Sequence, residues 1–210
     1  TRFLPPEAYG NVRYVENILN YIAAFLFWGY FYAGSRMLAV SDSDENSRYI
    51  RGSLLIILAI ASTILVSATF VCGLIHNGII TSLFFVSLPV CFQPLLLNYV
   101  SKVFPGDNHI IRIALTRFLP SLLYVPAAYL IYSRYGATES SMILLQWGIA
   151  VLVFICMIAS TRLSFSRVRQ VFPQIRKENA EYGRELFIGT LIAVASNYIA
   201  GITLGIFNDD

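Results

Sequence analysis

Long apolar stretches dominate this chain and decide what it can fold into. Six of them are long enough to cross a bilayer, because a helix rises about 1.5 Å per residue and roughly 20 residues cover a hydrocarbon core of about 30 Å. The second and the sixth contain no charged residue, and neither do the third and the fifth. The pattern predicts a membrane protein with spans at residues 14–33, 52–75, 79–100, 113–132, 141–160 and 186–207.

The spans are expected to be helices. Hydrophobic residues make up 57% of the chain and charged residues 13%, about half the charged share of soluble domains. Backbone groups in lipid must be paired within a helix or a closed barrel. Uninterrupted apolar runs such as residues 54–58 favour helices, because barrel strands alternate. The sequence therefore predicts an all-α polytopic membrane protein with six transmembrane helices.

Basic residues fall in alternate connections and predict an orientation. The segments 34–51, 101–112 and 161–185 hold eleven of them, whereas the opposite ends hold Arg2, Arg13 and Arg134. The richer side is expected to be cytoplasmic, which places both ends of the chain outside. The eleven are Arg36, Arg48, Arg51, Lys102, Arg112, Arg162, Arg167, Arg169, Arg176, Lys177 and Arg184.

The two ends of the chain predict a fragment of a longer protein. The chain starts with Thr1 instead of Met, and its last residues follow directly on an apolar stretch. No signal peptide precedes the first span, although the charges place its start outside. A further helix upstream would bring the protein's own N-terminus into the cytoplasm.

The segment 161–185 is the longest connection and carries six basic residues. Val168, Val171, Phe172 and Ile175 have the spacing of an amphipathic helix, and Pro173 is expected to break or kink it. One interpretation is a cytoplasmic loop with an interfacial helix. The other is a connector between two halves of a larger transporter, with basic residues near anionic lipid headgroups.

Polar residues within the spans are the candidates for function, since ionisable groups in a membrane usually face a cavity or a partner. Arg13, Glu16, Asn17 and Asn20 share one face of the first span. They are either a local ion pair with interhelical amide bonds, or the wall of a cavity open to the outside.

Arg117 is the second candidate, about five residues deeper in its span than Arg112. It either snorkels to the cytoplasmic interface or faces a cavity, where a guanidinium is suited to holding a phosphate. Single amides in other spans either join helices or contact substrate hydroxyls; they are Gln93, Asn98, Gln146 and Asn197.

Motifs of soluble enzyme chemistry are absent. The sequence has no Walker A motif, no dinucleotide-binding glycine fingerprint and no paired Cys-x-x-Cys. Asp42 and Asp44 form an Asp-x-Asp pair without a nucleotide-binding domain, so a solvated loop is expected there, and His76 and His109 are expected to be solvated loop residues. We therefore predict no enzyme activity, cofactor, metal site or nucleic-acid partner.

Three short segments resemble one family of membrane proteins. Residues 4–10 (Leu-Pro-Pro-Glu-Ala-Tyr-Gly) resemble the loop after the first helix of polysaccharide flippases. These are the O-antigen and capsule repeat-unit exporters of the multidrug/oligosaccharidyl-lipid/polysaccharide exporter superfamily. Residues 34–38 (Gly-Ser-Arg-Met-Leu) are similar to that family's segment before the third helix, and residues 182–187 (Tyr-Gly-Arg-Glu-Leu-Phe) resemble the start of its seventh helix.

The resemblance implies an order of parts for the chain, as helices two to seven of the family. Residues 1–160 would belong to the first bundle, 161–185 would be the basic cytoplasmic connector, and 186–210 would start the second bundle. Many relatives carry an Asp-Arg pair late in the seventh helix, where this chain has Ala200 and Gly201. Any role of that pair does not carry over.

The resemblance also implies a function. The family flips undecaprenyl-diphosphate-linked oligosaccharide across the bacterial plasma membrane to the external leaflet, driven by an ion gradient or the membrane potential. Substrate contacts are then expected at Arg117, then at the first-span set, with Gln93 and Asn197 as further candidates. A lipid-II or drug exporter of the same superfamily is the alternative transporter, and a polytopic membrane glycosyltransferase or polymerase is the alternative enzyme.

Overall fold

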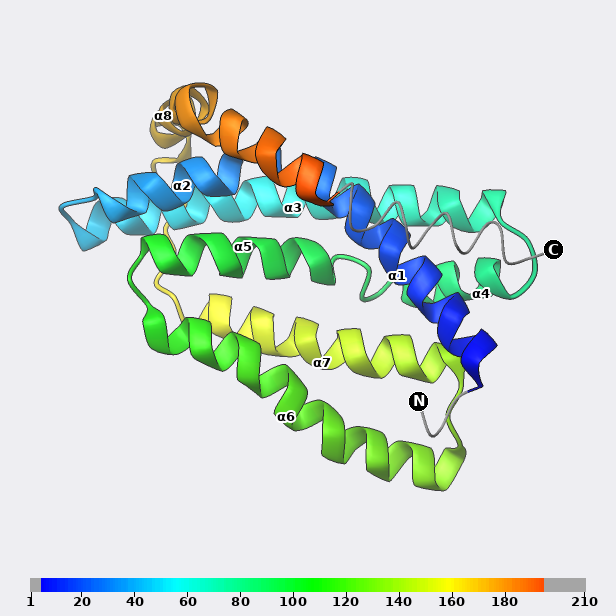
Figure 1. Cartoon of the computed structure of the whole chain (residues 1–210). Helices are drawn as coiled ribbons and strands as arrows, with labels where there is room; N and C mark the ends of the chain where they lie inside the picture. The colour runs from blue at the N-terminus through cyan, green and yellow to red at the C-terminus, as the bar shows by residue number, and fades with distance from the viewer. Residues whose placement is uncertain (1–4, 195–210) are drawn as a thin grey trace.

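The computed structural model describes residues 5–194, and within that range it consists of helices joined by short connections (Figure 1). The predicted all-α fold class is confirmed there. A further helical segment begins at residue 184 and continues to residue 194. The helices before it are α1 (Pro6–Leu26), α2 (Tyr30–Ala39), α3 (Asp44–Ile75), α4 (Gly78–Ser87), α5 (Gln93–Gly106), α6 (Ile110–Tyr135), α7 (Glu139–Ala159), α8 (Val168–Glu178) and the π-helical turn η1 (Asn179–Gly183).

Three of the described helices, α3, α6 and α7, are long and apolar enough to cross a membrane. The prediction of six continuous membrane helices is not supported, because two predicted spans are divided. The stretch 14–33 is shared between α1 and α2, and the stretch 79–100 between α4 and α5. Most of the stretch 186–207 lies outside the described residues.

The first division lies between α1 and α2. Trp28 and Gly29 both have positive φ values, 46° and 82°, and this left-handed backbone cannot continue a helix. A Cβ atom on Gly29 would lie 2.3 Å from the carbonyl oxygen of Gly183, so only glycine fits. The break therefore allows backbone-to-backbone contact between the first predicted span and η1.

The second division lies between α4 and α5, in the turn formed by residues 88–92. Pro89 is inside this turn and Pro94 follows Gln93 in the first turn of α5. Proline removes a backbone donor, which is tolerated at a helix start and disfavoured further in. Pro120 and Pro126, by contrast, lie inside an uninterrupted α6.

The connections gather at two opposite ends of the bundle. In Figure 1 the α2–α3, α5–α6 and α7–α8 connections lie at one end together with α8, and the α3–α4 and α6–α7 connections lie at the other. The helix ends and connections that carry the eleven basic residues meet at the first of these, which we call the basic end. The alternation expected from the sequence is thus present in space.

The core lies where α1, α2, α3, α5 and α7 meet, and aromatic residues fill its middle. Phe31 stacks on Phe27 and meets Tyr99 edge-on, with ring centroids 5.9 Å and 5.5 Å apart. All three side chains are almost fully buried. The basic connector packs on this core through Val171 and Ile175 of α8. The predicted amphipathic helix is therefore present, but it runs through Pro173 without the expected break.

Candidate functional site

Arg13 and Glu16 of α1 form an ion pair, with Arg13 Nη1 2.5 Å from Glu16 Oε2. The Glu16 side chain is 4% exposed and that of Arg13 is 44% exposed. Arg13 also donates a hydrogen bond from Nε to the Tyr9 hydroxyl at 2.8 Å. A buried carboxylate is thus neutralised by a cation that reaches it from the open side of the same helix.

Glu16 belongs to the buried face of α1, among Val12, Val15 and Leu19. The indole of Trp147 on α7 faces its carboxylate. Within the described residues its second oxygen, Oε1, is buried and has no hydrogen-bond partner. An acceptor left in this condition is costly, so the carboxylate has capacity for one more donor or for a cation.

The other two members of the predicted face are placed differently. Asn20 donates from its amide to the backbone carbonyl of Glu16 at 2.7 Å, and Asn17 is half-buried. A hydrogen bond from Asn11 to Glu139, at 3.0 Å, joins α1 to α7 near the same end of the helix. The local ion pair of the first interpretation is therefore present. Among the described residues, α1 lines neither a cavity along α3 nor one between α2 and α5.

Arg117 does not join this set. It is exposed on α6, which packs against α5 and α7 and makes no contact with α1. Gln93 is half-buried at the first position of α5. Asn197 lies outside the described residues. The structure therefore brings together the α1 candidates and leaves Arg117 apart from them.

An apolar cavity of about 470 Å³ lies between α3, α7 and the start of α5. Thr63 and Ser67 are on its wall, but their hydroxyls donate to carbonyls one turn earlier in α3, both at 3.0 Å. Their hydroxyl donors are thereby used within the helix. The cavity consequently offers hydrocarbon contact and little polar recognition.

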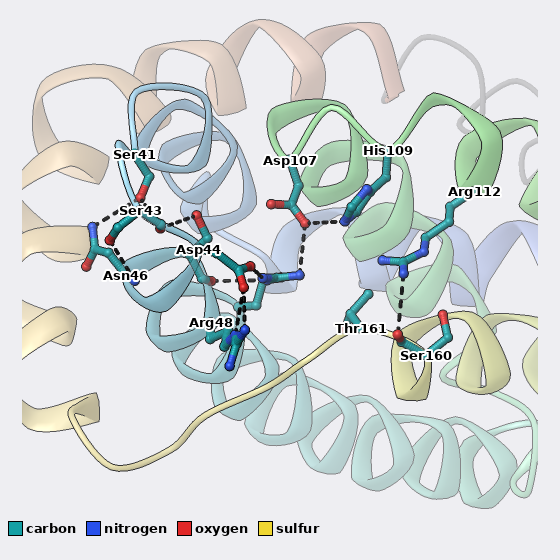
Figure 2. Close-up of polar contacts among 12 residues, drawn as sticks. Ser41, Ser43, Asp44, Asn46, Arg48, Asp107, His109, Arg112, Ser160 and Thr161 are labelled. Carbon is teal, nitrogen blue, oxygen red and sulfur yellow. Dashed lines mark hydrogen bonds and ion pairs between the residues drawn. The ribbon is translucent and has the colours of Figure 1, made fainter.

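A second charged cluster, at the basic end, was not predicted from the sequence. Its centre is Arg51, which is 3% exposed. Arg51 Nη1 lies 3.1 Å from Asp107 Oδ2 at the end of α5, and Nη2 lies 3.3 Å from Asp44 Oδ1 at the start of α3. Figure 2 shows Asp44 and Arg48 on one side of the cluster, and Asp107 with His109 on the other. We call these five residues the Arg51 cluster.

The start of α3 explains how this cluster is assembled. Ser43 caps the helix by accepting a hydrogen bond from the backbone N–H of Asn46 at 3.2 Å. Asp44 then occupies the first turn, where the helix dipole favours an acidic group. Arg48 and Arg51 follow one and two turns later and both reach Asp44. The second aspartate of the Asp-x-Asp pair thus belongs to the start of α3, where Asp44 forms ion pairs with Arg48 and Arg51.

His109 is not simply a solvated loop residue, since its Nε2 lies 2.9 Å from Asp107 Oδ2. Burial lowers the pKa of this imidazole below its ordinary value, and the positive charges of Arg112 and Arg51 act in the same direction. The carboxylates of Asp107 and Asp44 oppose that shift. The ring is therefore favoured in its neutral form beside Asp107.

One signal for the cluster was available in the sequence. Asp44, Arg48 and Arg51 have the i, i+4, i+7 spacing of one helix face. The partner Asp107 comes from another helix, and nothing in the local sequence connects it to Arg51.

Comparison of the chain with family models, with curated proteins and with solved structures finds no match.

Proposed function

We propose that this chain is part of a membrane transporter that moves undecaprenyl-diphosphate-linked oligosaccharide units from the cytoplasmic to the external leaflet of a bacterial plasma membrane. The chain would contribute six crossings. Three are the continuous helices α3, α6 and α7, and two are the divided pairs α1–α2 and α4–α5. The sixth would start in the helical segment at residue 184. The basic end would face the cytoplasm, with both ends of the chain outside.

The observation that carries this proposal is the Arg13–Glu16 pair. An ionisable pair within an otherwise apolar bundle is expensive to keep and is a functional-site hypothesis by default. The free Oε1 of Glu16 supports a role in binding, because it leaves one acceptor for a substrate hydroxyl or a coupling cation. Divided helices add further support, since transporters use interrupted spans around their binding sites.

The first test is replacement of Glu16 by Gln in the full-length protein. We expect surface polysaccharide to fall strongly while membrane abundance stays unchanged, because the amide keeps the size of the side chain and loses its charge. Glu7→Gln is the matched control, since Glu7 lies on the same helix and is exposed. Normal surface polysaccharide in the Glu16 variant at normal abundance would contradict the role of this carboxylate.

A second readout separates the transporter from the glycosyltransferase alternative. Loss of a flippase leaves the repeat unit complete and lipid-linked in the membrane, so intact lipid-linked oligosaccharide should accumulate. Loss of a glycosyltransferase would shorten the glycan instead. A lipid-II or drug exporter would leave surface polysaccharide unaffected and change peptidoglycan precursors or drug resistance.

Arg117 is tested separately, because it lies apart from α1. If it contacts the diphosphate, Arg117→Ala abolishes surface polysaccharide at unchanged abundance, and Arg117→Lys loses less because it retains the charge. Equal function of the alanine variant and the parent would remove Arg117 from the proposed site. The Glu16 experiment is unaffected by that outcome.

A further inference from the structure

A second cavity, of about 360 Å³, lies at the basic end between α2, the end of α5 and η1. Its walls include Tyr32, Ser35, Arg36, Gly106 and Tyr182. It is more polar than the cavity along α3, and it is built from three segments that are far apart in the sequence. We call it the α2–α5 cavity.

One cation, Arg36, lines the cavity, and a second, Lys102, lies next to the wall residue Tyr32. The Arg36 guanidinium lies 4.8 Å from the centre of the Tyr182 ring, and its Nη1 is 3.0 Å from Glu178 Oε1. The Lys102 ammonium lies 4.5 Å from the centre of the Tyr32 ring. Within residues 5–194, Lys102 forms no ion pair with a carboxylate. Arg36 and Lys102 thus bring two positive charges to the wall residues and their neighbours, against the one carboxylate of Glu178 that pairs with Arg36.

Close backbone packing holds these walls in place. A Cβ atom on Gly106 would lie 2.2 Å from the carbonyl oxygen of Ser35, so the end of α5 touches the α2 backbone directly. Asp107, the next residue, is fixed from the other side by Arg51. Tyr32 is fixed by a hydrogen bond of its hydroxyl with Thr190 Oγ1 at 2.7 Å. The cations are thus presented on a rigid frame, which lowers the entropic cost of binding.

A guanidinium and an ammonium on aromatic faces, together with a serine hydroxyl, suit an anion with several acceptor oxygens. Glu178 occupies one edge of Arg36, so an incoming anion has the remaining donors of its five N–H groups. The cavity lies at the end where charged residues follow the apolar lengths of α3, α6 and α7, which is the level of lipid headgroups. The cytoplasmic leaflet supplies anionic phosphate at that level.

We propose that the α2–α5 cavity binds the phosphoryl group of an anionic membrane lipid, held by Arg36 and attracted by the neighbouring Lys102. The site lies on a different set of helices from the Arg13–Glu16 pair. It is a binding site in its own right and does not depend on transport. Phosphate can also come from solution, and a competition with inorganic phosphate separates the two sources.

The test measures retained lipid on the full-length protein. Protein from nanodiscs of phosphatidylglycerol and phosphatidylcholine is moved into detergent, and retained lipid is counted by native mass spectrometry. We expect the parent to keep phosphatidylglycerol selectively. Lys102→Gln should lower its retention about tenfold, the effect of losing one charge-assisted interaction, and Arg36→Gln combined with Lys102→Gln should lower it further.

Arg169→Gln is the matched control, because Arg169 is an exposed cation on α8 at the same end. An equal loss of phosphatidylglycerol in the Arg169 and Lys102 variants would mean diffuse surface attraction and would overturn the proposal. So would the absence of selective retention by the parent. Complete release by millimolar inorganic phosphate would assign the site to soluble phosphate and overturn the lipid assignment. Lys102→Gln leaves the Arg36–Glu178 pair in place, so its result does not depend on that contact.

Discussion

The Arg13–Glu16 pair and the Arg51 cluster both bury one charged group, yet they use it in different ways. Glu16 has its charged partner on its own helix, one turn away. Arg51 joins the start of α3 to the end of α5, and its carboxylates come from both helices. Removing the first pair breaks no ion pair between helices, whereas removing the second breaks the ion pair that joins α3 to α5. The Arg51 cluster therefore serves architecture, and the α1 pair is available for function.

Replacement of Arg51 by Met is expected to have the largest effect on stability. Asp107 would keep its buried carboxylate beside a neutral imidazole, and a buried charge without its partner costs about 3–5 kcal/mol. Thermal unfolding in detergent measures the loss. Arg48→Met is the control, because its pair with the exposed Asp44 is screened by solvent and contributes little to stability. Similar losses in the two variants would contradict the architectural role of Arg51.

Glycine packing gives a second, smaller contrast between the same two regions. A Cβ atom on Gly52 would lie 2.1 Å from the carbonyl oxygen of Ser164, next to the Arg51 cluster, whereas one on Gly10 of α1 meets nothing within 4 Å. Gly52→Ala should therefore destabilise the fold by about 1–3 kcal/mol. Gly10→Ala should be neutral or stabilise it by up to about 1 kcal/mol. A Gly52→Ala variant as stable as the parent would show that the backbone near Ser164 shifts to accommodate the added Cβ atom.

Glu16→Gln should change the free energy of unfolding less than Arg51→Met or Gly52→Ala does, by less than about 1 kcal/mol. Its amide retains an acceptor oxygen beside Arg13, and Arg13 is exposed enough to be hydrated without its partner. The measurement is the unfolding midpoint of the same protein used in the polysaccharide assay. A fall in the unfolding midpoint as large as that of Arg51→Met would show that the α1 pair has a structural role, like the Arg51 cluster.

The smallest expected effect is a pH dependence at His109. Its pKa is lowered in the folded protein, so below its ordinary pKa of about 6.5 the unfolded chain binds more protons than the folded one. Stability contributed by the neutral ring is present above that pH and is lost as the pH falls. His109→Asn should therefore flatten the decline of the unfolding midpoint on the acid side. An unchanged profile would show that carboxylates alone cause the decline.

The sequence predicts most of the helical frame, because apolar lengths and turn residues are local signals. His76 lies in a connection, as expected, because α3 ends at Ile75 and α4 starts at Gly78. Pro89 and Pro94 predict a kink, and the structure has a complete break there. The left-handed Trp28 has no signal of its own, since its conformation follows from the contact of the neighbouring Gly29 with Gly183.

Of the candidate site, the sequence predicts what lies on one helix and misses what two helices share. Arg13 and Glu16 are one helical turn apart, so their contact follows from spacing alone. From the sequence alone, Arg51 looks like any other of the basic residues predicted to be cytoplasmic. Its burial is not predicted, because it depends on Asp107 from another helix. The α2–α5 cavity has the same origin, because Arg36 meets Tyr182, and Lys102 meets Tyr32, only after α2, α5 and η1 have packed.

The contact between Gly29 and Gly183 restricts how the basic connector can move. Each glycine would place a Cβ atom within 2.6 Å of the other's carbonyl oxygen. A slide by one residue would bring Trp28, Tyr30, Tyr182 or Arg184 into a gap that admits only hydrogen. Translation along α2 is thereby blocked, and the connector is held at one register on the bundle.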